Sequence, residues 1–340
     1  MDTIETDVLV AGGGLAGLAA TARFAAAGLE TVCIDPMPRS AEGPDLRTTA
    51  FLGPSVETLE SAGAWHAMEA GAEPLRVMRI VDAGGRERRV RETCDFEASE
   101  LRPGPFGYNV TNRNARRALL AAIEDQPRAR LLDGARVETV LRQTRDALAI
   151  LSDGRRVRAR LAVAADGRDS RLRRSAGIAA RRWDYGQQAL VFAVAHPEPH
   201  DGISTEIHRT GGPLTLVPMP DRDGRHMSSV VWMMPGPRAE RVAAMSDAAL
   251  GAEITADTMG LFGPLRVAGP RAVWPIIGQI AARMAGERLA LAAEAAHVIP
   301  PIGAQGLNMS LADIECLARL VETGEGRADP GARGVLARYE

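Results

Sequence analysis

The chain has 340 residues, more than one hydrophobic core usually fills, so its length predicts two domains. Hydrophobic residues make up 46% and charged residues 25%, an ordinary globular composition that excludes disorder of the whole chain. The net charge is −2, from 41 basic and 43 acidic residues, which argues against a nucleic-acid partner. All the basic residues are arginine, and the absence of lysine excludes Schiff-base catalysis, pyridoxal phosphate chemistry and a Walker-type phosphate loop.

The cysteine, histidine and apolar patterns exclude further classes of protein. Cys33, Cys94 and Cys316 form no C-x-x-C pair, which argues against a disulfide framework, a zinc knuckle and an iron–sulfur cluster. The six histidines show no metal-ligand spacing, so no metal is expected. Charged residues interrupt every apolar stretch well before the ~18 residues of a membrane-spanning helix. The acidic N-terminus runs into a strand pattern without a signal peptide, so we expect a cytoplasmic enzyme or one at the surface of the inner membrane.

The start of the chain contains a strand, a glycine-rich turn, a helix and a second strand. The first strand is a short apolar run, as a buried parallel strand requires. The turn fits the pattern G-x-G-x-x-G, and the second strand ends on an acidic residue. These elements are expected at 7–11, 12–17, 18–27 and 31–35.

Each glycine of the turn has a physical reason. Gly12 allows the tight turn, Gly14 removes a side chain where a pyrophosphate must approach the backbone, and Gly17 lets the helix and strand pack closely. The free N–H groups at the start of the helix, around Leu15 and Ala16, then face the phosphates.

Asp35 is placed to accept hydrogen bonds from a ribose diol, because it ends the second strand 23 positions after Gly12. The glycine pattern alone is a weak signal, and a plain glycine-rich turn is the alternative. The strand before it, the helix after it and the acid at this distance favour dinucleotide binding.

Two later blocks each follow a buried-strand pattern. The strand at 161–165 leads into Asp166-Gly167. The strand at 288–293 leads into Glu294 and a Pro- and Gly-rich turn, and a helix with apolar residues at helical spacing is expected from about 308 to 321.

Together these blocks resemble the flavin-dependent aromatic hydroxylases of the p-hydroxybenzoate hydroxylase fold, and most of all the ubiquinone-biosynthesis hydroxylases. That family has the patterns G-x-G-x-x-G, D-x-R-T-x-A, A-D-G-x-x-S-x-x-R and G-D-A-A-H-x-x-P-P-x-x-G-Q-G-x-N. The resemblance implies an α/β fold, with a Rossmann-like FAD-binding domain and an inserted antiparallel-sheet substrate domain. The matching residues are Gly12, Gly14 and Gly17; Asp45, Arg47, Thr48 and Ala50; Ala165, Asp166, Gly167, Ser170 and Arg173; and Ala295, Ala296, His297, Pro300, Pro301, Gln305, Gly306, Leu307 and Asn308.

The resemblance also implies roles for these residues. The guanidinium of Arg47, which is planar and always charged, is expected to approach the flavin and its diphosphate. Glu294 stands where the family's carboxylate holds the ribityl chain of FAD. The last helix directs its first N–H groups at the pyrimidine end of the isoalloxazine ring, where negative charge gathers on reduction. The other expected FAD contacts in the second and third motifs are Asp166, Gly167, Gly303, Gln305, Gly306, Leu307 and Asn308.

The roles of two further residues, Asn112 and His297, are also suggested by their places in the family pattern. Asn112, ahead of a helix at 115–123, falls where the family often has a flavin-contacting polar residue, and an exposed N-cap is the other interpretation. His297 is expected to be a structural residue of its motif, because no nucleophile lies near it in the sequence.

Two departures from the family pattern bear on these roles. The chain has Ala293-Glu294 where the family usually has Gly-Asp, so we expect the flavin to sit slightly displaced or to bind more weakly. Family chains also continue with further helices beyond the segment that resembles 336–340. We therefore expect a truncated form that exposes apolar surface near Leu336.

Between the flavin motifs, the sequence shows the patterns of antiparallel strands and tight turns. An alternating pattern with an Ala-Gly-Gly turn predicts a hairpin at 75–92, and several strand-like runs lie between 188 and 275, two of them joined by the turn Asp221–Gly224. Helical patterns near 239–245 and 250–259 are expected to pack on this sheet. The predicted FAD-binding domain is 1–72, 102–180 and 275–340, and the predicted substrate domain is 73–101 and 181–274.

The pocket between the two domains is expected to be aliphatic, because aromatic residues make up only 4% of the chain. Such a pocket suits a prenyl tail. Candidate lining residues, for which ordinary packing is the alternative, are Val217, Met219, Trp232, Met233 and Met234.

The function implied by the resemblance is that of an FAD monooxygenase. It uses NADPH or NADH and oxygen to hydroxylate a hydrophobic, prenylated phenol in ubiquinone biosynthesis. The cofactor carries the difficult step, which explains why no catalytic side chain stands out. Two alternatives stay open: another FAD oxidoreductase on the same fold, such as a reductase or epoxidase, and a non-catalytic flavin-binding partner in a biosynthetic complex. Peripheral membrane association and a homo-oligomer also stay open.

Overall fold

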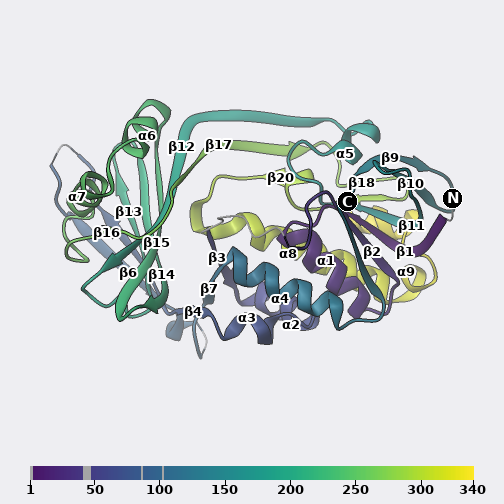
Figure 1. Ribbon diagram of the computed structural model, residues 1–340, viewed down its shortest axis with the longest axis horizontal. Helices are drawn as coiled ribbons and strands as arrows, with labels where there is room; N and C mark the ends of the chain where they lie inside the picture. The colour runs from purple at the N-terminus through teal and green to yellow at the C-terminus, as the bar shows by residue number, and fades with distance from the viewer. Residues whose placement is uncertain (1–2, 41–46, 86, 102) are drawn as a thin grey trace.

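The computed structural model describes residues 3–40, 47–85, 87–101 and 103–340. Two large sheets lie side by side and are joined by two long strands, with a small third sheet at their junction (Figure 1). The predicted motif residues Asp45 and Leu46 lie outside the described ranges.

The first sheet is built on parallel strands in the order β19-β11-β1-β2-β8, with antiparallel strands β18, β10 and β9 at its margins. Its central strands are continuous apolar runs because both faces are covered, and residues 161–164 of β11 are fully buried. The bounds are β1 Thr3–Ala11, β2 Thr31–Asp35, β8 Ala129–Asp133, β9 Val137–Arg142, β10 Ala147–Leu151, β11 Arg156–Ala164, β18 Ala285–Gly286 and β19 Leu289–Leu291.

Helices α1 and α8 pack together on one face of this sheet, with α4 beside α1 (Figure 1). Their alanine-rich apolar faces share one core with the strands. The helices of this part are α1 Leu15–Ala26, α2 Gly53–Ser61, α3 Trp65–Glu69, α4 Asn112–Glu124, α5 Arg171–Ser175, α8 Gln305–Glu322, α9 Gly324–Ala328 and α10 Arg333–Tyr339. One-turn 3-10 helices are η1 Ala98–Glu100, η2 Ala293–Ala295 and η3 Ile302–Ala304.

The second sheet has the order β20-β17-β12-β15-β14-β13-β5-β6, with β16 beside β12, and is antiparallel except where β13 pairs with β5. Helices α6 Gly236–Ala243 and α7 Asp247–Asp257 contribute to the core on one of its faces. The strands are β5 Val77–Asp82, β6 Glu92–Glu97, β12 Ala180–His196, β13 Ile203–Arg209, β14 Gly212–Arg222, β15 Arg225–Pro235, β16 Arg266–Val267, β17 Ala272–Ala281 and β20 His297–Val298. The third sheet contains β3 Thr48–Leu52, β7 Gly107–Thr111 and β4 Ala72–Leu75.

Of the two predicted hairpins of this region, the one at Asp221–Gly224 is confirmed and the one at 75–92 is confirmed only in part. Asp223 and Gly224 join β14 to β15 with φ angles of +53° and +70°, as the tight hairpin turn favoured by an Asp-Gly pair requires. Strands β5 and β6 pair, but β6 begins only at Glu92, where the predicted hairpin ended, so the connection between them is longer than the predicted Ala-Gly-Gly turn.

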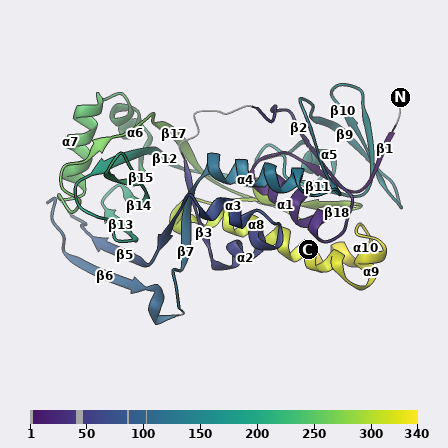
Figure 2. The ribbon, with the colours of Figure 1, turned by 60° about the horizontal axis from the view of Figure 1, so that its bottom comes forward.

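The expectation of exposed apolar surface near Leu336 is wrong. Leu336 is only 5% exposed, because α10 folds back against the first sheet and α8 (Figure 2). The Tyr339 hydroxyl anchors this helix by donating to the Leu291 carbonyl oxygen at 2.7 Å. Among the described residues, none of the helices is long and apolar enough to cross a membrane.

Candidate functional site

The turn between β1 and α1 has room for a ligand only at one of its glycines. Gly12 has a φ of +104°, and a Cβ atom there would lie 2.3 Å from the Ala165 carbonyl oxygen. A Cβ atom at Gly17 would lie 1.8 Å from the Gly12 carbonyl oxygen, so the crossing of helix and strand excludes any side chain. Gly14 is exposed, and a Cβ atom there would meet nothing within 4 Å. The open side of the turn is therefore at Gly14.

No side chain caps the N-terminus of α1, so an anion can bind there. Gly14 is its N-cap and supplies no side-chain acceptor, so the first N–H groups, at Leu15 and Ala16, have no side-chain cap. Arg116 reaches the same turn from α4 and donates from Nη1 to the Gly13 carbonyl oxygen at 2.8 Å. Arg116 was not predicted from the sequence, although it lies one helical turn after Asn112. The turn thus combines N–H groups that have no side-chain cap with a guanidinium, a set of donors that suits a diphosphate.

Asp35 is buried at the end of β2 and shapes the same turn. One carboxylate oxygen accepts from the Gly13 N–H, and the other accepts from the Met37 N–H at 2.7 Å. Each oxygen keeps a second lone pair, so the carboxylate can still accept from a ribose hydroxyl. Burial raises the pKa of the neighbouring Cys33 thiol to about 12, so this side chain adds no charge under the turn.

The second motif holds an unused acceptor. Asp166 Oδ2 accepts from the N–H groups of Arg171 and Leu172 at 2.8 and 3.2 Å, at the start of α5. Asp166 Oδ1 is buried and has no hydrogen-bond partner in the described part of the chain. Gly167 follows with a φ of +83°, a conformation that favours glycine, and a Cβ atom there would meet nothing within 4 Å. A buried acceptor of this kind needs a donor, and a cofactor hydroxyl supplies one.

The third motif begins with Glu294, which lies in η2 with its side chain 49% exposed. Its two carboxylate oxygens pair with Nη2 and Nε of Arg168, both at 3.2 Å. His297 is paired through Nε2 with Asp313 Oδ2 of α8 at 2.6 Å, so it has the structural partner expected of a motif residue.

The motif ends at the exposed start of α8. Gly303 and the N-cap residue Ala304 have φ angles of +61° and +54°, and Gln305 and Gly306 that follow are exposed. Leu307, the next residue, is partly buried against the core.

Asn308 lies at this end of α8 but turns inward. Its Oδ1 accepts from the Leu52 N–H at 2.9 Å, and its Nδ2 donates to the carbonyl oxygens of Ala50 and Ala304 at 2.8 and 2.7 Å. Asn308 therefore fixes the start of α8 on β3, and its amide is occupied by backbone groups.

Arg47 and Asn112 lie at the opposite margin of the site. The Arg47 guanidinium carbon lies 4.7 Å from the ring centroid of Trp274 on β17, and the Arg47 carbonyl oxygen accepts from the Asn112 N–H at 2.9 Å. Asn112 Oδ1 accepts from the Thr49 hydroxyl at 2.9 Å. The interpretation of Asn112 as an N-cap is wrong, because Thr111 caps α4.

The topology brings the three motifs together. Strands β1, β11 and β19 are parallel neighbours, so the turn at 12–17, the loop at 166–170 and the turn at 292–296 all follow carboxyl ends at one edge of the sheet. The open glycine, the orphaned Asp166 oxygen and the exposed start of α8 fit a long cofactor with a diphosphate and several hydroxyl groups.

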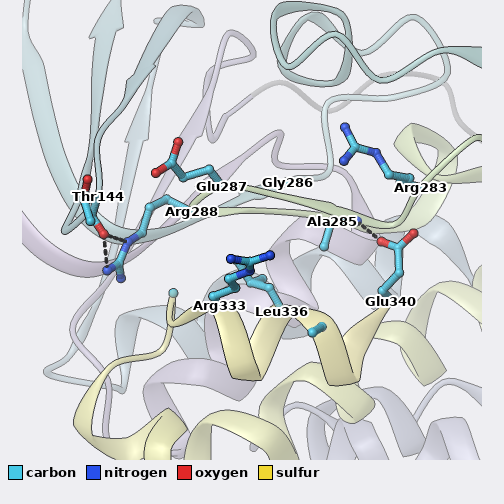
Figure 3. A pocket seen from close by; sticks show the side chains of 11 residues that line it. Thr144, Arg283, Ala285, Gly286, Glu287, Arg288, Arg333, Leu336 and Glu340 are labelled. Atoms are coloured by element: carbon cyan, nitrogen blue, oxygen red, sulfur yellow. Dashed lines mark hydrogen bonds between the residues drawn. The ribbon is translucent and has the colours of Figure 1, made fainter.

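A separate cavity of about 650 Å³ lies near the C-terminus (Figure 3). Arg283, Arg288 and Arg333 face it with Glu287 and Glu340, over an apolar floor that includes Leu336. Arg288 is already bound to the Thr144 carbonyl oxygen and to Asp329. None of the predicted site residues lines this cavity.

Comparison with known proteins agrees with this geometry. A family model described as "FAD binding domain" matches residues 5–339. Ubiquinone hydroxylase UbiL of Rhodospirillum rubrum is 36% identical over 98% of this chain and 76% of its own length. The 3-demethoxyubiquinol 3-hydroxylase of Escherichia coli is 28% identical over 100% of this chain and 86% of its own length.

Solved structures show the same fold. The p-nitrophenol 4-monooxygenase PnpA of Pseudomonas putida superimposes with a TM-score of 0.78 at 19% identity, covering 100% of this chain and 84% of its own. The predicted fold class, family and cofactor are confirmed. The chain belongs to the FAD-binding domain family, and it is an FAD-dependent monooxygenase with the p-hydroxybenzoate hydroxylase fold.

Proposed function

We propose that this monooxygenase hydroxylates a hydrophobic, prenylated phenol in ubiquinone biosynthesis. The observation that carries the proposal is the meeting of three cofactor motifs at one sheet edge, in a chain whose relatives are named as ubiquinone hydroxylases. NADPH or NADH supplies two electrons, and oxygen supplies one atom to the ring and one to water. Bound FAD supplies the hydride acceptor and the oxygen-activating group.

The chain's own residues have binding and orienting roles in this proposal. The N–H groups at Leu15 and Ala16, with Arg116, hold the diphosphate beside Gly14. Asp35 accepts from a ribose hydroxyl. These groups lie at the end of the site formed by β1 and β2.

The other end of the site orients the flavin. Asp166 Oδ1 and the Glu294 carboxylate accept from cofactor hydroxyls, and the start of α8 at Gln305 and Gly306 turns its N–H groups to the ring. Asn308 supports this helix end from behind. The site contacts proposed for Gly12, Gly17, Arg47, Asn112, Gly167, Gly303 and Leu307 stay predictions.

The substrate is proposed to lie on the face of the second sheet that α6 and α7 leave uncovered. Ala189, Val191, Val231 and Met233 gather there in a small cluster separate from the core under the helices. This cluster is apolar and contains no aromatic residue, which supports a prenylated substrate.

The candidate lining residues divide between the two faces. Side chains alternate along a strand, so Val217 on β14 shares the uncovered face with Ser229 opposite it. Met219 belongs to the neighbouring small cluster on the same face. Trp232 and Met234 were wrong choices, because they are buried in the core that α6 and α7 share.

This arrangement supports the predicted division into an FAD-binding domain at 1–72, 102–180 and 275–340 and a substrate domain at 73–101 and 181–274. A prenylated substrate partitions into lipid, which supports a cytoplasmic enzyme that works at the surface of the inner membrane. Homo-oligomerisation and a biosynthetic complex stay predictions.

Product analysis tests the function. Purified protein is incubated with FAD, NADPH, oxygen and a prenylated phenol, and the product is examined by mass spectrometry. The expected result is a ring that has gained one oxygen atom, with NADPH consumption that depends on the phenol. The matched control is Gly14→Val, which blocks the open side of the turn.

The other outcomes separate the alternatives. Oxygen on the prenyl double bond instead of the ring points to an epoxidase. Flavin reduction that leaves the phenol unchanged points to a reductase. Bound flavin without any NADPH oxidation points to a non-catalytic partner.

A further inference from the structure

The loops of the second and third motifs are neighbours across the sheet edge. Strands β11 and β19 pair in parallel with Ala164 opposite Leu291, so the residues that follow each strand emerge side by side. The side chains of Arg168 and Glu294 meet there in a two-bond ion pair. Exposed ion pairs hold their geometry weakly, so something else must fix the spacing of these two loops.

Gln279 of β17 makes that connection. It is only 3% exposed, and its Nε2 donates to the Arg168 carbonyl oxygen at 2.9 Å and to the Glu294 carbonyl oxygen at 3.3 Å. A side-chain amide nitrogen has two hydrogens, so one group can hold both loops at once. No sequence motif includes this residue.

A second buried side chain, Arg173 of the second motif, contacts the same two loops. Arg173 donates to the Arg168 carbonyl oxygen at 3.1 Å and to the Ala295 carbonyl oxygen at 2.8 Å. Arg173 lies on α5, which directly follows the Arg168 loop, so it joins the second motif to the third from within the second motif.

Gln279, in contrast, belongs to the long ribbon formed by β12 and β17 (Figure 1). Its cross-strand neighbour Arg182 pairs with Asp169 of the same loop at 3.2 Å. The ribbon therefore holds the Arg168 loop with two adjacent side chains, and it also carries Trp274 on the way to the second sheet.

We propose that Gln279 is a positioning residue for FAD: it sets the spacing at which Arg168 orients the Glu294 carboxylate toward the cofactor. The ribbon that bears the substrate face thereby also sets the position of this flavin-holding carboxylate. The inference rests on the cofactor site of the proposed function and not on the identity of the phenol. Measurements of FAD affinity therefore test it independently of hydroxylation.

The test replaces the amide by groups of nearly the same size. Gln279→Glu has no hydrogen to donate at neutral pH, and its carboxylate faces two carbonyl oxygens. The Kd for FAD, measured by flavin fluorescence on titration of apoprotein, is expected to rise about tenfold at about pH 7.5. Burial raises the pKa of a carboxyl group, so at about pH 5.5 the protonated acid donates its single hydrogen to one of the two carbonyl oxygens. The Kd is therefore expected to recover in part, to about threefold above that of wild type at that pH. The charged groups joined to this network are Arg168, Asp169, Arg173, Arg182 and Glu294.

Two further variants complete the test. Gln279→Met has neither donor nor charge, so the loss of affinity is expected at both pH values. Gln126→Glu is the matched control, because Gln126 donates to a single backbone carbonyl, that of Ala62, outside the site. It is expected to bind FAD like wild type at both pH values. Wild-type affinity in Gln279→Met, or an equal loss at both pH values in a folded Gln279→Glu, overturns the inference.

Discussion

Ala293 and Ala304 both hold a left-handed backbone, with φ angles of +56° and +54°, at two positions where the family pattern of the third motif has glycine. The first begins η2 beside Glu294, and the second is the N-cap of α8. A side chain in this conformation costs about 1–2 kcal/mol. The two alanines therefore place backbone strain on both sides of the flavin-directed turn.

Replacing either alanine by glycine is expected to relieve this strain. Glycine also loses more entropy on folding, so the net gain in the free energy of unfolding is expected to be about 0.5–1 kcal/mol for each variant. Denaturant unfolding measures it. Ala70→Gly is the control, since Ala70 is exposed with a φ of −59°, and this variant is expected to lose a similar amount. Destabilisation by both Ala293→Gly and Ala304→Gly would contradict the prediction.

Gly14 and Gly17 are expected to respond differently to the same substitution. Gly14→Val points its side chain into open space, so the fold is kept and FAD binding is lost. Gly17→Val drives its side chain into the Gly12 carbonyl oxygen, so both the fold and FAD binding suffer. Thermal melting of the apoproteins, beside flavin content, distinguishes the two. Retained flavin in Gly14→Val would show that the cofactor does not approach this turn.

The strands and glycine turns could be predicted because their signals are local. Strand β2 was placed correctly at 31–35. Helix α1 begins at Leu15 and α8 at Gln305, three residues before the predicted starts at 18 and 308. The first turn of α8 is exposed at Gln305 and Gly306, and that of α1 contains Ala16 and Gly17, so strongly apolar residues at helical spacing mark neither start.

Contacts between elements could not be predicted in this way. Arg116 and Gln279 reach the site from α4 and β17, and only the topology brings them to the motif loops. The error at Trp232 and Met234 has a related cause. Alternation along a strand separates two faces but does not say which face the helices cover.

Glu294→Gln is expected to weaken FAD binding by about 1.5–3 kcal/mol, the scale of a hydrogen bond to a charged group. The neutral amide accepts less strongly from a hydroxyl and no longer balances Arg168. Titration of apoprotein with FAD measures the change. Glu287→Gln is the control, because Glu287 lies at the separate cavity. Unchanged affinity in Glu294→Gln would show that this carboxylate pairs with Arg168 and does not contact FAD.

The contact between α1 and α8 is expected to weaken in acid. Burial raises the pKa of Glu315, but hydrogen bonds from Arg23 and Arg319 outweigh it and hold that pKa below its ordinary value. The carboxylate therefore stabilises the fold above its unfolded pKa near 4.5, and this contribution disappears as the pH falls through the lower folded pKa. Urea unfolding between neutral pH and about pH 3 should show the loss.

Glu315→Gln removes the same contribution at neutral pH. Arg23 keeps Glu322 as a partner, so the expected destabilisation is about 1–3 kcal/mol, with a flatter pH profile than wild type. Glu124→Gln is the control, since its ion pair with Arg39 is exposed, and a change within about 0.5 kcal/mol is expected. A pH profile in Glu315→Gln as steep as that of wild type would assign the acid sensitivity to other groups.

Trp274 is expected to hold Arg47 ready for the cofactor. The guanidinium lies over the indole ring at 4.7 Å, which is worth about 0.5–1 kcal/mol at a partly exposed site. A side chain that is already ordered loses less entropy when it binds a diphosphate. Trp274→Leu should therefore weaken FAD binding about three- to tenfold, and Trp274→Phe should lie between it and wild type because a smaller ring keeps part of the attraction. Tyr185→Leu, an exposed aromatic on the same ribbon, should bind FAD normally. Wild-type affinity in Trp274→Leu would show that Arg47 reaches its position without the ring.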